Sequence, residues 1–191
     1  MRLLDTGWLT GVRRCASPNV DARPDPEDLS LLVLHCIALP PRQYSGHAVR
    51  QLFCNQLNTQ EHPYFAGLEG VRVSAHLFIR RQGSIWQFAA LRDRAWHAGQ
   101  SMWQGRERCN DYSIGIELEG SDDRPYTQAQ YRQLRRLIPI IRRRYPAISA
   151  ENIVGHEHIA PGRKTDPGPG FDWRRLWRDV AASEAPARQR R

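Results

Sequence analysis

The stretch LLVLHCI, Leu31–Ile37, decides the fold. It is a short, continuous apolar run, which is typical of a β-strand buried on both faces at the centre of a sheet. His35 interrupts the run close to its end. In open sheets with parallel strands, ligand sites lie beyond the carboxyl ends of the strands. We therefore expect a central strand here, with His35 placed where function is often found.

A second strand is predicted over SIGIELE, Ser113–Glu119. Its apolar residues alternate with Gly115, Glu117 and Glu119, so the two carboxylates face the same way. Alternation alone does not choose between Glu117 and Glu119 as a functional group. Either carboxylate could equally be a solvated residue on an exposed sheet face.

A β-hairpin and a third strand follow from shorter patterns. Apolar and polar residues alternate over 73–80, and a Gln82-Gly83 turn leads into a second short strand over 84–88. Residues 152–156 predict a short strand that ends at His156. The following segment, Ala160–Gly170, is too rich in proline and glycine to be regular structure. A hairpin beside a buried strand indicates a mixed sheet.

Three helices complete the pattern. Ser45 is expected to cap the first, whose apolar residues recur at spacings of three and four. Thr127 and Gln130 form a capping box for a second, longer helix. A third begins near Trp173. The fold class is therefore α/β, a single domain over residues 1–183 with a mixed central sheet flanked by helices. Residues 184–191 are expected to be a disordered basic tail.

The basic charge of the chain is concentrated in arginine. Of 28 basic residues, 27 are arginine and one is Lys164, which gives a net charge of +8. Such a balance invites nucleic-acid binding. However, six arginines fall over 132–144 on one predicted helix and three more in the tail. A solvated helix face and a frayed end explain this distribution better, so no nucleic-acid partner is expected.

Composition also bears on the compartment. The amino-terminal residues carry Asp5 and Gly7 where a secretory signal would be continuously apolar, and no run of the chain is long enough to span a bilayer. The four cysteines are scattered and form no CxxC pair, which fits reduced thiols. A cytoplasmic protein without a membrane partner is the expectation.

Histidine supplies the candidates for metal chemistry. The chain has seven histidines but no HExxH motif, so a metal site would have to gather residues from separate elements. His35 and His156 lie at the ends of predicted strands, and Asp166 lies in the irregular loop that follows. On strand periodicity, however, His158 is the more obvious partner of His156. Spacing alone leaves the ligand set open.

Four long motifs resemble a known family. They are LLVLHCIALPP, VSAHLFIRRQGSIWQF, RAWHAGQSMWQGRERCNDYSIGIELEG and GHEHIAPGRKTDPGP. In this order they resemble the zinc-dependent N-acetylmuramoyl-L-alanine amidases, which are related to phage lysozyme amidases and peptidoglycan recognition proteins. The resemblance runs from about Leu3 to Trp177. It implies one Zn²⁺ per chain, held by His35, His156 and Asp166, with Glu117 and Lys164 acting beside the metal.

The resemblance also implies a reaction. The expected activity is hydrolysis of the amide bond between (1,6-anhydro-)N-acetylmuramic acid and L-alanine in small muropeptides, during peptidoglycan recycling in the cytoplasm. Glu117 would move the proton of the attacking water, and Lys164 would stabilise negative charge on the carbonyl oxygen. Two alternatives are a recognition module that binds without cutting, and a lytic amidase that acts on intact wall. The protein is expected to be a monomer.

Five residues are candidates for binding the substrate. Trp96 could stack on the sugar and His97 could hydrogen-bond to it, although Trp96 could equally be a core residue. Arg72 and Arg108 occupy positions at which the family would hold the acidic stem peptide, a role that suits the guanidinium fork. Asn110 is a weaker candidate in the same segment. His158 departs from the family pattern and is either a neutral substitution or part of a lid.

Overall fold

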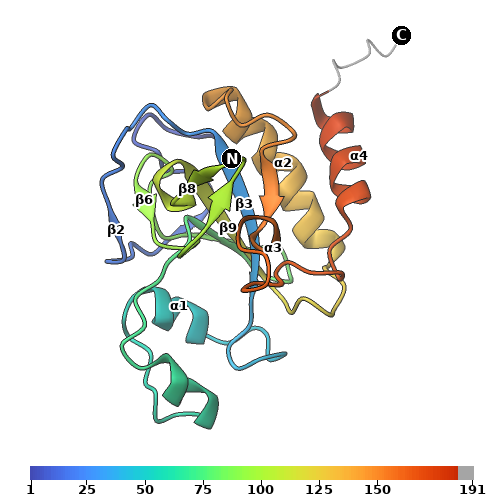
Figure 1. The fold of residues 1–191 in the computed structure, drawn as a ribbon. Helices are drawn as coiled ribbons and strands as arrows, with labels where there is room; N and C mark the ends of the chain where they lie inside the picture. The colour runs from blue at the N-terminus through green and yellow to red at the C-terminus, as the bar shows by residue number, and fades with distance from the viewer. Residues whose placement is uncertain (185–191) are drawn as a thin grey trace.

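The architecture is a six-stranded mixed sheet with helices on both sides, as seen in the computed structural model, which describes residues 1–184 (Figure 1). Along the sheet the order is β1 (Arg13–Arg14), β5 (Ile85–Gln87), β4 (Leu77–Ile79), β9 (Ser113–Glu119), β3 (Leu31–Ile37) and β10 (Ile153–Gly155). Only the β4–β5 hairpin is antiparallel; the other neighbours pair in parallel. The predicted α/β class with a mixed sheet is confirmed.

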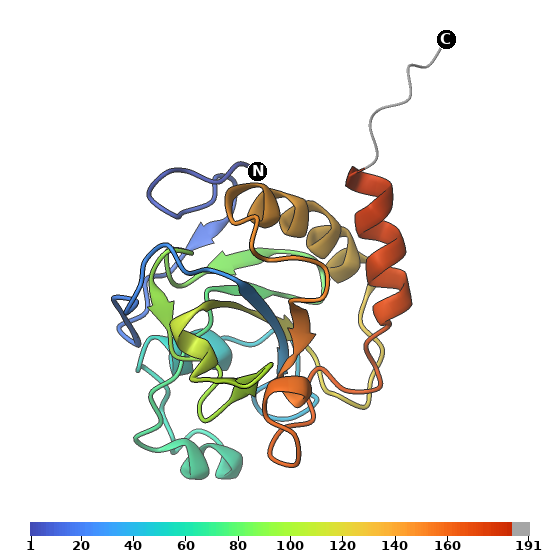
Figure 2. The ribbon, with the colours of Figure 1, turned by 45° about the horizontal axis from the view of Figure 1, so that its top comes forward.

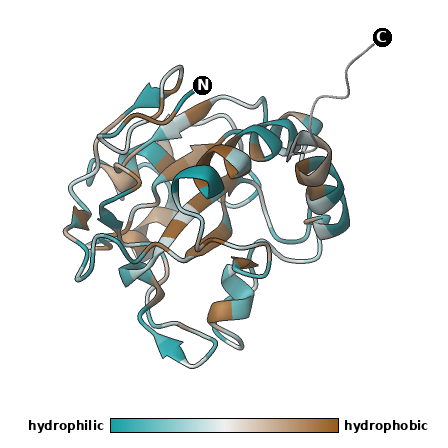
Figure 3. Cartoon of the chain, turned by 90° about the horizontal axis from the view of Figure 1, so that it is seen from above, coloured by the Kyte–Doolittle hydropathy of each residue, from teal (hydrophilic) through white to brown (hydrophobic). Residues whose placement is uncertain are grey.

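The two faces of β3 and β9 have different surroundings. Leu32 and Leu34 of β3 and Ile114 and Ile116 of β9 are fully buried in the main core, against the helices. The alternate residues of β3, such as Val33, pack in a smaller cluster on the other face. Both faces of the central strand are thus covered, which explains its continuous apolar sequence. Figure 3 shows hydrophobic residues on the central strands and hydrophilic ones on the outward sides of the helices.

Two long helices cover the main core. The helix α2 (Gln128–Arg144) begins at the predicted capping box, in which the Thr127 hydroxyl accepts from the Gln130 amide and the Gln130 side chain accepts from Thr127. The helix α4 (Trp173–Glu184) packs beside α2 (Figures 1 and 2). The predicted tail 184–191 lies outside the described residues except for Glu184, which ends α4.

Smaller elements surround the other face. They are α1 (Ala48–Phe53), α3 (His156–Ile159), the 3-10 helices η1 (Pro63–Leu68) and η2 (Cys109–Asp111), and the two-stranded pairs β2 (Val20–Asp21) with β6 (Arg94–Ala95) and β7 (Met102–Trp103) with β8 (Arg106–Glu107). None of the described helices is both long and apolar enough to cross a membrane.

Three predicted boundaries were wrong. Ser45 does not cap α1: it has a φ of 70°, its amide donates to Glu119, and the helix begins at Ala48. In the hairpin, only Leu77–Ile79 of residues 73–80 forms a strand. The strand predicted to end at His156 ends at Gly155, and His156 begins α3.

Candidate metal centre and active site

The register of the parallel strands places the first groups of the site. His35 of β3 lies directly opposite Glu117 of β9, so these two side chains are neighbours on the same sheet face. Gly155 of β10 lies opposite Leu34, and His156 therefore follows at the level of His35. His35 and His156, which are 121 positions apart in the sequence, thus meet beside Glu117 at the carboxyl ends of three adjacent parallel strands.

Three side-chain atoms converge at this point. The distance from His35 Nδ1 to His156 Nδ1 is 2.9 Å, and Asp166 Oδ2 lies 3.2 Å from each of them. Zinc bonds of about 2.0–2.1 Å at tetrahedral angles separate ligand atoms by about 3.3 Å. Two imidazoles and one carboxylate are also the donor set of catalytic zinc sites, which keep a fourth position open. The donors and their spacing therefore fit Zn²⁺.

The outer nitrogens of both histidines are also engaged. His156 Nε2 donates to the Ala98 carbonyl at 3.1 Å. His35 Nε2 lies 2.9 Å from Nδ1 of His97. A hydrogen on Nε2 of each ligand histidine leaves its Nδ1 lone pair free, and both lone pairs point to the same place. The tautomers of His35 and His156 are thus set by hydrogen bonds to groups that are not proposed metal ligands.

The loop that carries Asp166 is held by contacts on several sides. The Tyr126 hydroxyl donates to the Pro167 carbonyl at 2.9 Å, and the Thr165 hydroxyl donates to Asp122 at 2.7 Å. Burial alone would raise the pKa of Asp166, but the adjacent imidazoles of His156 and His35 more than offset it and hold the pKa well below its usual range. The carboxylate is therefore ionised and ready to act as a ligand.

Glu117 and Glu119 have opposite surroundings. Among the described residues, the buried Oε2 of Glu117 has no hydrogen-bond partner. Burial and then the negative charge of Asp166 raise the pKa of Glu117 well above its usual value, while Lys164 opposes them. Glu119 is instead buried and accepts hydrogen bonds from the amides of Ser45 and Arg81. Glu117 is thus the carboxylate free to engage a ligand.

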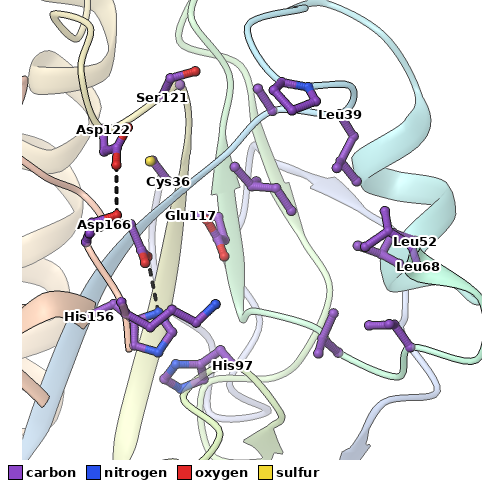
Figure 4. Close-up of a pocket in the computed structure, with 18 of the residues that line it drawn as sticks. Cys36, Leu39, Leu52, Leu68, His97, Glu117, Ser121, Asp122, His156 and Asp166 are labelled. Carbon is purple, nitrogen blue, oxygen red and sulfur yellow. Dashed lines mark hydrogen bonds and ion pairs between the residues drawn. The ribbon is translucent and has the colours of Figure 1, made fainter. Parts of the chain in front are cut away.

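A pocket of about 630 Å³ opens over these groups. This volume is in the range of small-molecule sites. Figure 4 shows two ends: His97, Glu117, His156 and Asp166 gather at one, and Leu39, Leu52 and Leu68 at the other. Trp96 and Lys164 also line it. The site can therefore hold a ligand with both a hydrolysable polar group and an apolar part.

The structure does not bring all predicted binding residues into this pocket. In the described chain, Arg72, Arg108 and Asn110 are absent from its lining. Arg72 is exposed, and Arg108 is exposed and paired with Asp111 at 3.0 Å. The Asn110 side chain accepts from the amides of His97 and Ala98, so it holds the loop that carries His97.

Sequence reasoning missed Arg163 and did not foresee the contacts of His97 and His158. Arg163 lines the pocket and donates to the carbonyls of Ala98 and Gln100, contacts for which no local pattern gives a signal. His97 lines the pocket, but both its ring nitrogens have protein partners, so the predicted sugar hydrogen bond is not what its geometry favours. His158 lies two residues after His156 on α3, where it accepts from the Gly155 amide at 2.8 Å and contacts Trp173. It is not the partner that strand periodicity predicted.

Comparisons with known proteins agree with this geometry. A family model described as N-acetylmuramoyl-L-alanine amidase matches residues 25–169. The chain is 57% identical over 174 residues to the 1,6-anhydro-N-acetylmuramyl-L-alanine amidase AmpD of Citrobacter freundii, covering 91% of this chain and 92% of that protein. A crystal structure of a selenomethionine derivative of AmpD is 56% identical, with a TM-score of 0.90 over 93% of this chain and 99% of that one.

A more distant structure includes a substrate. The amidase AmiD of Escherichia coli, in complex with anhydro-N-acetylmuramic acid-L-Ala-D-γ-Glu-L-Lys, is 31% identical, with a TM-score of 0.60 over 93% of this chain and 65% of that one. The shared fold therefore accommodates an anhydro-muropeptide in that relative.

Proposed function

Because the chain belongs to the N-acetylmuramoyl-L-alanine amidase family, we propose that it hydrolyses the amide bond between 1,6-anhydro-N-acetylmuramic acid and L-alanine in small muropeptides. The observation that carries this proposal is the convergence of His35, His156 and Asp166 beside Glu117, whose buried Oε2 has no hydrogen-bond partner in residues 1–184. We assign the three converging residues as ligands of one Zn²⁺ per chain. Zinc, when bound, supplies Lewis-acid polarisation of the scissile carbonyl and makes hydroxide available at neutral pH.

Glu117 is the proposed general acid and base. Its Oε2 takes a proton from the attacking water, and the same proton then goes to the nitrogen of the departing L-alanine. The C–O bond to the water oxygen forms first, and the C–N bond breaks as its nitrogen receives the proton, which yields a free lactyl carboxyl group and a free peptide amine. This role is supported by the burial of Oε2 with no hydrogen-bond partner from the described part of the chain, since the carboxyl group can exchange its proton with a ligand in the pocket.

Lys164 is the proposed stabiliser of the developing negative charge. It lines the pocket and is close enough to both His35 and Glu117 to affect their charge states. A compact ammonium group can approach the carbonyl oxygen as a point charge, whereas a guanidinium is broad and planar. This is the one position in the chain with lysine rather than arginine.

The substrate is proposed to lie across both ends of the pocket. Trp96 would contact the sugar from the lining. The stem peptide would extend beyond the pocket toward Arg72, Arg108 and Asn110. There the exposed guanidinium groups of Arg72 and Arg108 could pair with its carboxylates. His97 would contribute its ring to the wall rather than a hydrogen bond to the sugar.

The proposed setting is peptidoglycan recycling in the cytoplasm, by a monomer with no nucleic-acid or membrane partner. The recycling substrate is supported by the relatives named for the 1,6-anhydro sugar, which match over nine-tenths of their length. A module that only binds muropeptide would not need the complete constellation of ligands and Glu117. A lytic amidase acting on intact wall is the alternative that an assay must separate.

Substrate preference tests the proposal. Zinc-loaded protein is incubated with anhydro-muropeptide and, separately, with intact sacculi, and the released peptide is quantified by chromatography. We expect rapid release from the anhydro-muropeptide and little from sacculi. His35→Ala serves as the matched control, and it should retain less than one equivalent of zinc and show no turnover. A clear preference for sacculi would favour the lytic alternative, and no release from either substrate would leave only a binding module.

A further inference from the structure

The ring of His97 lies between a proposed zinc ligand and the backbone of β9. Its Nδ1 is 2.9 Å from Nε2 of His35, and the two rings meet edge to face at an interplanar angle of 81°. On its other side the ring lies against Gly115. A Cβ atom at that position would be 2.5 Å from Cγ of His97 and 2.6 Å from its Nδ1. Only glycine leaves room for the ring.

This contact explains a residue that the strand pattern does not. Glycine in the interior of a strand weakens it and often marks a close approach by another group. Gly115 is the third residue of β9, and its amide is fixed by donating to Nδ1 of His76 at 3.0 Å. The backbone under the His97 ring therefore carries no side chain, and its position is fixed by a hydrogen bond.

The hydrogen-bond direction follows from chemistry. Because Nδ1 of His35 faces His156 and Asp166, the hydrogen of the neutral His35 ring is on Nε2, and it is donated to Nδ1 of His97. The hydrogen of His97 is then on Nε2, which lies 3.2 Å from the hydroxyl of buried Ser113. The backbone of His97 is held as well, since its amide donates to Asn110. Both ring nitrogens and the backbone amide of His97 therefore have a partner in this arrangement.

We propose that His97 is a positioning residue that fixes the tautomer and ring orientation of His35, and that Gly115 exists to admit its ring. The inference rests on the proposed zinc site but assigns His97 a role distinct from binding the sugar. Hydrogen-bond partners of ligand histidines typically account for about 10- to 100-fold in metal affinity. Loss of the His97 acceptor should therefore weaken zinc binding through His35.

A pair of substitutions distinguishes the loss of the hydrogen-bond acceptor of His97 from the loss of its ring. His97→Phe keeps a flat ring over Gly115 but has no acceptor. His97→Asn loses the ring, but its Oδ1 is the same number of bonds from Cα as Nδ1 of histidine and can accept from His35. His47→Phe is the control, because His47 is an exposed histidine at the start of α1 whose side chain makes no capping hydrogen bond.

The readout is zinc affinity, measured by competition with a chromogenic chelator at fixed pH, with folding checked by circular dichroism. We expect His97→Phe to bind zinc about 10- to 100-fold more weakly than the parent, and His97→Asn and His47→Phe to remain within about threefold. Equal affinity of folded His97→Phe and the parent would overturn the proposal while leaving the zinc site intact. A parent that binds no zinc would overturn the proposed function as well.

A measurement on the unsubstituted protein decides the matter if His97→Phe does not fold. Nitrogen-15 NMR of the zinc-loaded chain reports which ring nitrogen of each histidine carries hydrogen. We expect hydrogen on Nε2 of His97 and an unprotonated, hydrogen-bonded Nδ1. Hydrogen on Nδ1 of His97 would contradict the proposed direction and overturn the inference.

Discussion

At the scale of single residues, the two carboxylates of β9 differ in what surrounds them rather than in where they point. Glu117 has a buried oxygen with no hydrogen-bond partner among the described residues, while Glu119 accepts hydrogen bonds from the amides of Ser45 and Arg81. A free carboxylate can take part in proton transfer, whereas one that joins two loops is part of the scaffold. The two residues therefore form a matched pair for mutagenesis.

Glu117→Gln should keep its zinc but lose about 100- to 10,000-fold in kcat, because the amide cannot move the proton. Glu119→Gln should keep kcat near that of the parent and lower the free energy of unfolding by about 1–3 kcal/mol, since its hydrogen bonds are weakened. Steady-state kinetics, zinc content and urea denaturation distinguish the two effects. An unchanged kcat for Glu117→Gln would exclude it as the proton carrier.

His76 should make stability depend on pH. Burial first, and then the positive charge of Arg23, lower the pKa of His76 to about 3, against an ordinary value of about 6.5. Between these values the unfolded chain binds a proton that the folded chain does not, so stability is complete above about pH 6.5 and is lost as the pH falls toward 3. At pH 5 the loss from this one group is about 2 kcal/mol.

The measurement is urea denaturation of zinc-free protein at pH 7 and pH 5. Other buried histidines add to the total loss, so the variant His76→Asn isolates one contribution: its side-chain oxygen can still accept from the Gly115 amide, but it does not titrate. The decrease between the two pH values should be about 2 kcal/mol smaller in His76→Asn. An identical decrease in both proteins would show that His76 is not buried in its neutral form.

At the scale of elements, the capping box of α2 also joins the helix to the sheet. The Thr127 hydroxyl contacts the Arg81 carbonyl, and the Gln130 side chain donates to the carbonyls of Ile79 and Glu119. Thr127→Ala should therefore cost about 1–2 kcal/mol of unfolding free energy. The exposed Gln128→Ala, one residue later, should cost less than about 0.5 kcal/mol. Thermal denaturation of both variants compares a lost cap with a neutral change on the same helix turn.

The elements that sequence predicts well are those specified by local residues. The strands over 31–37 and 113–119 and the helix after Thr127 depend on apolar patterning and a cap within a few residues. Ser45 was mispredicted because its amide pairs with Glu119, 74 positions away, which no local pattern reveals. The two-residue strands, such as β1, are too short to carry a period at all.

The same distinction applies to the site. The strand patterns placed His35 at the carboxyl end of its strand and directed Glu117 to one side. They could not select Asp166 over His158, because the path of the 160–170 loop is set by contacts with Asp122 and Tyr126 from elsewhere in the chain. Only the family resemblance supplied that choice.

At the scale of the whole molecule, the three proposed ligands join β3 of the central sheet to the last loop before α4. A ligand that binds only the folded state stabilises it, by about 2.7 kcal/mol at a free concentration of 100 times Kd. For a chain of this size that corresponds to a rise in Tm of about 5–10 °C. Calorimetry with and without zinc measures the shift, and Asp166→Ala should abolish it. An equal shift in Asp166→Ala would place the stabilising metal elsewhere.

The position of β10 has a consequence for biosynthesis. This three-residue strand pairs with β3 and is the last strand to be made, although β3 is among the first. Until the ribosome has released residue 155, the apolar LLVLHCI strand has an open edge, and unpaired edges of this kind attract other chains. A chain interrupted before that point lacks a complete active site and also exposes a template for aggregation. The open edge of β3 is therefore covered by β10 at nearly the same stage of synthesis at which the last proposed metal ligands, His156 and Asp166, are added to the chain.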